Sequence, residues 1–272
     1  MKEEKKINKE EKKINKEEKK INKENNSSKK KYISGEKEPI QSSTIDESID
    51  IISLHEYYDE LIPKRKGTNG IPGVMNNIRA IILYQNSFVN EDIVNKQLAR
   101  LNSENRSYHF SIDTNGVIFQ LNPVDRTVPH CSTVEYTKTA NEYFGDNICP
   151  VFKASAATPH YGSPNSCSVA INLPRVNGDG NINEKVLKSL IKLCSYIINK
   201  YAPSLQAQAN ILCNFKINAN ANKDPVVFFN DQDFYHKFKY DVEVKRTHWL
   251  RNYKGAARGY PTEKIEFYKL PE

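Results

Sequence analysis

One histidine, His130, stands where a polar hairpin would deliver it to a binding or catalytic site. It lies near the end of the stretch SYHFSIDTNGVIFQLNPVDRTVPHC, residues 107–131, in which Asn115-Gly116 tolerates the positive φ that a hairpin turn needs. Pro129 cannot donate a hydrogen bond to a sheet ladder, so His130 should lie on a loop or a strand edge. We therefore expect this hairpin to form part of a site.

Alternation along the first strand of the hairpin suggests a different role for His109. Tyr108, Phe110 and Ile112 alternate with His109, Ser111 and Asp113, which is the pattern of a half-buried strand. His109 should then point away from Tyr108, and a core or edge position is favoured over metal ligation.

Cys131, His160 and Cys213 are the other side chains that could ligate a metal near such a site. His160 lies within residues 132–164, a stretch with little periodicity whose length indicates a functional or disordered insertion. A lone histidine there is more often a surface residue. Cys213 ends an apolar run, which favours a buried thiol. For His130, hydrogen bonding to a ligand is favoured over metal binding.

Short apolar strands and amphipathic helices must position these residues. The pattern predicts strands over residues 78–83, which lead into Tyr84, over 169–173 and over 208–215. It predicts helices over residues 52–62, 90–101 and 183–201, and another that begins at residue 233. Together these elements indicate an α/β fold with a central mixed sheet of about five strands flanked by helices.

Composition divides the chain into three parts: a tail and linker over residues 1–50, a folded domain over 51–244, and an aromatic and basic extension over 245–272. The first 31 residues carry 13 Lys and 7 Glu, so nearly all of the formal net charge of +7 belongs to the tail. Residues 2–22 are three copies of KEEKKIN. One isoleucine per heptad is half of what a coiled-coil seam needs, so we expect a solvated helix or a disordered segment. A tether to an anionic polymer is one interpretation of this tail, and a low-complexity repeat of little consequence is the favoured one.

Several classes of protein are disfavoured by the rest of the composition. No apolar run approaches the ~18 residues of a membrane span, and the N-terminus lacks the apolar segment of a secretory signal. The five cysteines contain no CxxC pair, which fits the reduced thiols of a cytosolic protein.

Five motifs occur in a consistent order along residues 61–238. They are IPGVMN at 71–76 with the strand that follows, SYHF at 107–110 with its turn, His130, NSCSVAI at 165–171, and the polar loop at 214–225. In this order they resemble the type-2 N-acetylmuramoyl-L-alanine amidases, whose zinc amidase fold is shared by phage endolysins and peptidoglycan recognition proteins. The resemblance implies that fold, zinc as cofactor, and peptidoglycan or muropeptide as partner.

The resemblance places the metal positions at Tyr84, Asn214 and Asp224. The family carries two histidines and a cysteine or aspartate there, so only Asp224 is retained. Neutral tyrosine and asparagine are poor zinc ligands compared with imidazole, and one carboxylate cannot hold the ion alone. Zinc is therefore expected from the family but disfavoured by these residues.

The resemblance also implies the remaining site residues. Lys223 matches a lysine that polarises the substrate carbonyl, Tyr108 matches a tyrosine near the metal, and the acid that assists the water falls at Asn172. With Asn172 in place of a carboxylate, proton transfer worth about 10²- to 10⁴-fold would be lost. The substrate groove would be formed by Tyr108, His130, Asn165 and Lys223.

Three functional hypotheses follow from the sequence. The favoured one is a peptidoglycan-directed protein that binds muropeptide with weak or no hydrolysis. The second is a working amidase with a non-standard metal site, and the third is a scaffold that binds an anionic polymer through its basic tail. Without a secretory signal, we expect the protein in the cytoplasm, or at the cell wall after release by lysis or from a particle.

Overall fold

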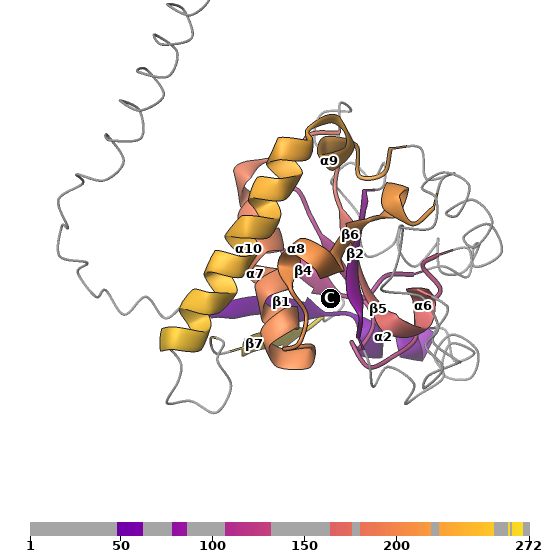
Figure 1. The fold of residues 1–272 in the computed structure, drawn as a ribbon. Helices are drawn as coiled ribbons and strands as arrows, with labels where there is room; N and C mark the ends of the chain where they lie inside the picture. Colours follow the sequence, from indigo (N-terminus) through magenta and orange to yellow (C-terminus); the bar gives the residue numbers. More distant parts are fainter. Residues whose placement is uncertain are drawn as a thin grey trace, which may run out of the picture. The chain divides into compact units, whose positions relative to one another are not determined.

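A single seven-stranded sheet organises the folded body, with strands in the order β6-β2-β5-β3-β4-β1-β7 (Figure 1). The computed structural model describes residues 48–61, 78–85, 107–131, 164–175, 180–218, 223–252, 261 and 263–268. The strands are β1 (Ile49–Ser53), β2 (Ala80–Gln85), β3 (Phe110–Ile112), β4 (Ile118–Gln120), β5 (Ser168–Leu173), β6 (Ile211–Cys213) and β7 (Glu263–Phe267). The helices are α2 (His55–Leu61), α6 (Pro164–Cys167), α7 (Glu184–Tyr201), α8 (Ala207–Asn210), the 3-10 helix η3 (Asn214–Lys216), α9 (Val226–Asn230) and α10 (Gln232–Asn252).

The sheet is mixed, as the sequence predicts. β3 and β4 form an antiparallel hairpin, and the other pairs, β1–β4, β1–β7, β2–β5, β2–β6 and β3–β5, are parallel. Every residue of β2 and of β5 is buried, as expected for parallel strands that are covered on both faces. The predicted α/β class with helices on a central sheet is confirmed.

The sheet has two more strands than the predicted five, because the two segments at this end of the sheet, β1 and β7, lack a clear strand pattern. Ile52 belongs to β1, and the helix predicted over residues 52–62 begins only at His55 as α2. A run of five residues with mixed polarity does not separate strand from helix by periodicity. β7 carries three charged residues out of five and lies at the sheet edge, where little apolar surface is needed.

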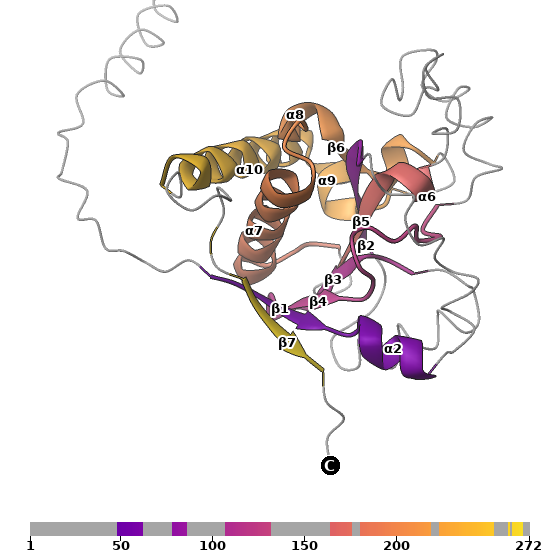
Figure 2. The same ribbon diagram turned by 90° about the horizontal axis from the view of Figure 1, so that it is seen from below.

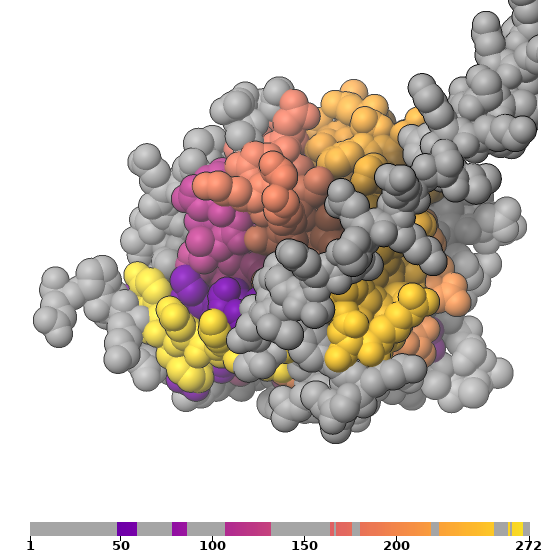
Figure 3. All heavy atoms as spheres, turned by 90° about the vertical axis from the view of Figure 1, so that its left-hand side faces the viewer, coloured from indigo at the N-terminus to yellow at the C-terminus, as the bar shows by residue number. Residues whose placement is uncertain are grey.

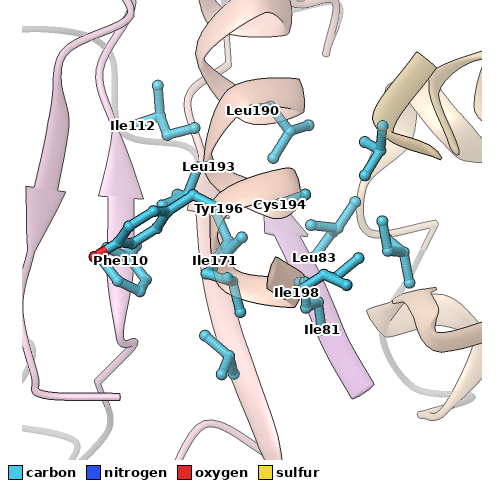
Figure 4. Close-up of a cluster of buried hydrophobic side chains, with 14 of the residues drawn as sticks. Ile81, Leu83, Phe110, Ile112, Ile171, Leu190, Leu193, Cys194, Tyr196 and Ile198 are labelled. Atoms are coloured by element: carbon cyan, nitrogen blue, oxygen red, sulfur yellow. The ribbon is translucent and has the colours of Figure 1, made fainter. Parts of the chain in front are cut away.

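The principal core lies between the sheet and α7 (Figure 4). Ile81, Leu83 and Ile171 of the central strands face Leu190 and Leu193 of α7, and all five side chains are fully buried. α10 packs beside α7 (Figure 2). A second apolar cluster covers the opposite face of the sheet and includes Ile82, Tyr84 and Tyr108.

Helix α7 confirms the helix predicted over residues 183–201 and also fixes the hairpin. Asn183 caps the helix, since its Oδ1 accepts from the Val186 N–H at 2.9 Å, while its Nδ2 donates to the Thr114 carbonyl at 2.7 Å. Ser189 Oγ donates to the Gly116 carbonyl at 2.6 Å. The hairpin turn is therefore held by two side chains of the helix and its cap.

Two further predictions differ from the structure or lie beyond it. The strand predicted over residues 208–215 is wrong over most of its length: α8 ends at Asn210, β6 spans Ile211–Cys213, and η3 follows. Asn210, the last residue of α8, donates from Nδ2 to the Arg79 carbonyl at 3.0 Å. The chain enters the sheet at the next residue, Ile211. The predicted helix over 90–101 and the insertion over 132–163 lie outside the described residues.

The C-terminal elements continue the folded body past residue 244. α10 begins at Gln232, close to the predicted start at 233, and runs without a break to Asn252, and β7 then pairs with β1. Among the described helices, none has the length and apolar character that a membrane span requires.

Candidate functional site

The three predicted metal positions gather at the end of β2. The Asp224 carboxylate accepts from the backbone N–H of Gln85, the residue after Tyr84, through Oδ1. Its Oδ2 accepts from Asn214 Nδ2 at 2.9 Å, and its backbone carbonyl accepts from the Phe215 N–H at 2.8 Å. The loop that carries Asp224 is thus attached both to β2 and to η3.

The Tyr84 hydroxyl lies within hydrogen-bonding distance of two residues at the end of the hairpin arm, the segment 121–131 that follows β4. It is 2.8 Å from His130 Nδ1 and 3.0 Å from Cys131 Sγ. Ser168 Oγ donates to the Pro164 carbonyl at 2.6 Å and therefore accepts from His130 Nε2 at 3.2 Å. This places the ring proton of His130 on Nε2 and leaves Nδ1 as the acceptor for the Tyr84 hydroxyl, which in turn accepts from the Cys131 thiol. We call these four side chains, Tyr84, His130, Cys131 and Ser168, the hydroxyl relay.

Burial keeps Tyr84 and His130 of the hydroxyl relay uncharged. Desolvation raises the pKa of Tyr84 well above its ordinary value, and the neighbouring Cys131 raises that pKa further. Desolvation also lowers the pKa of His130 well below its ordinary value, with His109 acting in the same direction. At neutral pH the relay therefore contains a phenol and a neutral imidazole.

Asn165 holds the arm in place. Its Oδ1 accepts from the backbone N–H groups of His130 and Cys131 at 3.0 and 2.8 Å, and its Nδ2 donates to the Cys131 carbonyl at 2.9 Å. One side chain thus fixes the backbone of both residues that reach Tyr84.

Tyr108 lies beside this cluster, although not on the face that alternation predicts. Its ring centroid is 5.1 Å from that of Tyr84, in the second apolar cluster, whereas Phe110 and Ile112 lie in the core under α7. The expectation that Tyr108, Phe110 and Ile112 share one face is therefore wrong. The chain bends at His109, before β3 begins, and this bend interrupts the alternation.

His109 occupies the core, as expected. It is fully buried; Nδ1 accepts from the Ala170 N–H at 3.0 Å, and Nε2 donates to the Arg126 carbonyl at 2.9 Å. Cys213 is likewise fully buried, as its position after an apolar run predicts, and His160 lies outside the described residues.

The last two predicted site residues have contrasting surroundings. Asn172 is directly opposite Tyr84 in the β2–β5 pair, is 3% exposed, and donates from Nδ2 to Ser111 Oγ at 3.1 Å. Lys223 is exposed, has a φ of 66°, and holds its Nζ 5.3 Å from the centre of the Phe229 ring. The structure thus brings Tyr84, Tyr108, His130 and Asn165 together at one cluster, and Asn214 and Asp224 together beside it.

The donors at the predicted metal positions do not fit zinc. Tyr84 is a neutral phenol engaged with His130 and Cys131, Asn214 is an amide that donates to Asp224, and both carboxylate oxygens of Asp224 already accept hydrogen bonds. Structural and catalytic zinc sites use imidazole, thiolate and carboxylate ligands. Within the described ranges, no three His, Cys, Asp or Glu side chains come together as a metal site.

Sequence reasoning missed two residues of this region. Gln85 is buried and donates from Nε2 to the Pro174 and Gly180 carbonyls at 3.0 and 2.7 Å, while its Oε1 accepts from the Val226 N–H at 2.9 Å. Ser168 orients His130. A polar residue at the end of an apolar strand was the available signal for Gln85, whereas nothing in the sequence distinguishes Ser168.

These features define an α/β protein whose polar cluster lies at the carboxyl end of a buried parallel strand. Residues 75–226, more than half of the chain, match the model of the N-acetylmuramoyl-L-alanine amidase family. The chain belongs to this family.

Solved structures of related folds are similar to the chain at low sequence identity. The N-acetylmuramoyl-L-alanine amidase LysC from Clostridium intestinale URNW is 16% identical over 63% of this chain and 86% of its own, with a TM-score of 0.39. The PlyG catalytic domain is 14% identical over 72% of this chain and 94% of its own, with a TM-score of 0.48. The peptidoglycan recognition protein PGRP-SA from Drosophila is 11% identical over 64% of this chain and 91% of its own, with a TM-score of 0.38. No curated protein sequence matches the chain.

Proposed function

We propose that this protein is directed to peptidoglycan and binds muropeptide with weak or no amide hydrolysis. The observation that carries the proposal is the chemistry at the three family metal positions. Tyr84 is hydrogen-bonded to His130, and Asn214 donates to Asp224, whose other carboxylate oxygen accepts from the Gln85 N–H. These groups are therefore engaged with one another and with the protein rather than arranged as a set of zinc ligands.

Weak hydrolysis follows from the loss of two functions. A catalytic zinc polarises the substrate carbonyl and lowers the pKa of a bound water to about 7, and the donor set here is unsuited to hold it. A carboxamide at Asn172 cannot accept a proton as a carboxylate does, which removes a contribution of about 10²- to 10⁴-fold.

Binding would use the wall formed by the hairpin arm, together with the exposed Lys223 on the loop that carries Asp224. In this proposal Lys223 offers its ammonium to a carboxylate of the muropeptide, and Asn165 lines the wall at a half-buried position. Tyr108 and His130, which are 2% and 5% exposed, support that wall from behind.

Two parts of the proposal concern the tail and the place where the protein acts. Residues 1–47 of the tail lie outside the described residues, and an anionic polymer as their partner stays a prediction. To bind peptidoglycan, a member of this family must reach the wall, and we propose that this protein does so after lysis or from a particle.

Sedimentation with purified peptidoglycan, zinc analysis and a turbidity assay test the proposal together. We expect the protein to pellet with peptidoglycan, to contain little zinc and to clear the suspension poorly. Lys223→Gln should weaken pelleting severalfold, whereas Lys237→Gln, at an exposed lysine of α10, should not. Stoichiometric zinc together with clearing that a chelator abolishes would support the working amidase and overturn the proposal.

A gain-of-function variant tests the reasoning about the ligands. Tyr84→His combined with Asn214→His places two imidazoles beside Asp224, the ligand set of the family. We expect this double variant to retain zinc that the parent protein does not. A double variant that retains no more zinc than the parent would show that more than these two ligands has changed.

A further inference from the structure

Strand β7 ends the sheet and exposes apolar side chains at its rim. It pairs with β1 on one side, and no other strand of the described chain pairs with its outer side (Figure 2). Ile265 and Phe267 are 41% and 54% exposed. Figure 3 shows this strand, in yellow, at the surface beside β1 in indigo. An exposed edge of this kind is a template for pairing with another strand.

The backbone of β7 shows which groups face outward. The Tyr268 N–H donates to the Ser53 carbonyl of β1 at 2.9 Å, so Tyr268 points its backbone groups inward. Because these groups alternate in direction along a strand, Lys264 and Glu266 also point theirs toward β1. The outward backbone groups therefore belong to Glu263, Ile265 and Phe267.

We propose that β7 pairs in antiparallel fashion with β7 of a second copy, about a two-fold axis at Ile265. This register sets Ile265 opposite Ile265 and Glu263 opposite Phe267, so that all outward N–H and C=O groups meet outward groups of the partner. It also sets each Lys264 opposite a Glu266, at the non-hydrogen-bonded positions where side chains approach most closely.

The neighbouring registers are disfavoured by the same sequence. A shift by two residues places Lys264 opposite Lys264 in one direction and Glu266 opposite Glu266 in the other, and like charges directly opposite are destabilising. A shift by one residue sets outward backbone groups against inward ones. The charges of Lys264 and Glu266 therefore favour the register centred on Ile265. In this register the same surface of both copies forms the interface, so the assembly is a closed dimer.

Side chains of the adjacent elements support this arrangement. Asp50 of β1 lies opposite Lys264, so acid, base and acid alternate across β1, β7 and the second β7. On the other face of β7, Lys200 Nζ of α7 lies 2.7 Å from Glu263 Oε2 and compensates the charge of this carboxylate. Phe267 of the second copy would therefore lie opposite an ion pair and not opposite an isolated charge.

Sedimentation analysis of the full chain over a range of concentrations tests the dimer. We expect wild type to associate as concentration rises, and Lys264→Glu or Glu266→Lys alone to raise the dissociation constant by about tenfold to a hundredfold, because two attractive pairs become repulsive. An equimolar mixture of the two variants should restore association. In the mixed dimer, each position 264 again faces a position 266 of opposite charge.

Two comparisons keep the result specific. Glu266→Lys leaves the Asp50–Lys264 pair intact, so its effect reports on contact between copies, and Lys237→Glu on α10 controls for net charge. Wild type that stays monomeric at all concentrations, or variants whose mixture associates no better than either alone, would overturn the dimer. Neither outcome bears on peptidoglycan binding, which pelleting measures separately.

Discussion

Acid should destabilise this protein through His109. Burial lowers the pKa of His109 from about 6.5 to about 4, because an imidazolium in the core would lose its hydration. Protonation of Nδ1 would also abolish its hydrogen bond from the Ala170 N–H. The folded state therefore keeps this ring neutral under conditions in which the unfolded chain would protonate it.

The change in the free energy of unfolding with pH follows from the number of protons that the folded and unfolded chains bind at His109. Between pH 6.5 and 4 the unfolded chain binds more protons at His109 than the folded chain, so the free energy of unfolding falls as pH falls through that window. The contribution is fully present above pH 6.5. The fall of the pKa from 6.5 to about 4 corresponds to about 3 kcal/mol in total, and most of this is lost by pH 4.5. Against a typical total of about 5–15 kcal/mol, this loss is large.

Urea denaturation of wild type and His109→Gln at pH 7 and pH 4.5 measures the effect. Glutamine removes the titrating group, and groups that do not interact with His109 contribute to both proteins and cancel in the comparison. Because His109 also lowers the pKa of His130, the difference between the two proteins includes this coupling, which acts in the same direction. We expect wild type to lose about 2–3 kcal/mol more than the variant on acidification, while His236→Gln, at an exposed position on α10, behaves as wild type. If His109→Gln loses as much stability as wild type, the assignment of the acid sensitivity to His109 is wrong.

Two further substitutions test the hydroxyl relay and the hairpin. Tyr84→Phe leaves His130 Nδ1 without its donor and should lower the free energy of unfolding by about 1–3 kcal/mol, whereas Tyr240→Phe, at a side chain that is 62% exposed, should have no measurable effect in the same urea titration. Gly116→Ala should lower the free energy of unfolding by about 2 kcal/mol or more, because φ is +82° and a Cβ would lie 2.8 Å from the Lys185 carbonyl oxygen. Thermal unfolding measures this effect, and a melting temperature equal to that of wild type would contradict this account of the turn.

Much of the fold could be predicted because local pattern and tertiary structure agree. The helix at α7 follows from its broad apolar face, and β2 and β5 follow from short runs of buried residues. Strand β1 and the edge strand β7 could not be predicted in the same way. They are short and partly polar, and their stability comes from pairing with each other and with β4, which periodicity does not report.

The sequence by itself determined which chemical groups stand at the family positions: a phenol at Tyr84, an amide at Asn214 and a carboxylate at Asp224. That was enough to disfavour zinc. The tertiary structure decided what these groups do instead. Tyr84 meets His130 and Cys131 across 46 and 47 residues of chain, and Gln85 meets Asp224 across 139. Contacts at such separations depend on how the sheet closes the intervening loops, and the spacing of residues along the chain does not encode that closure.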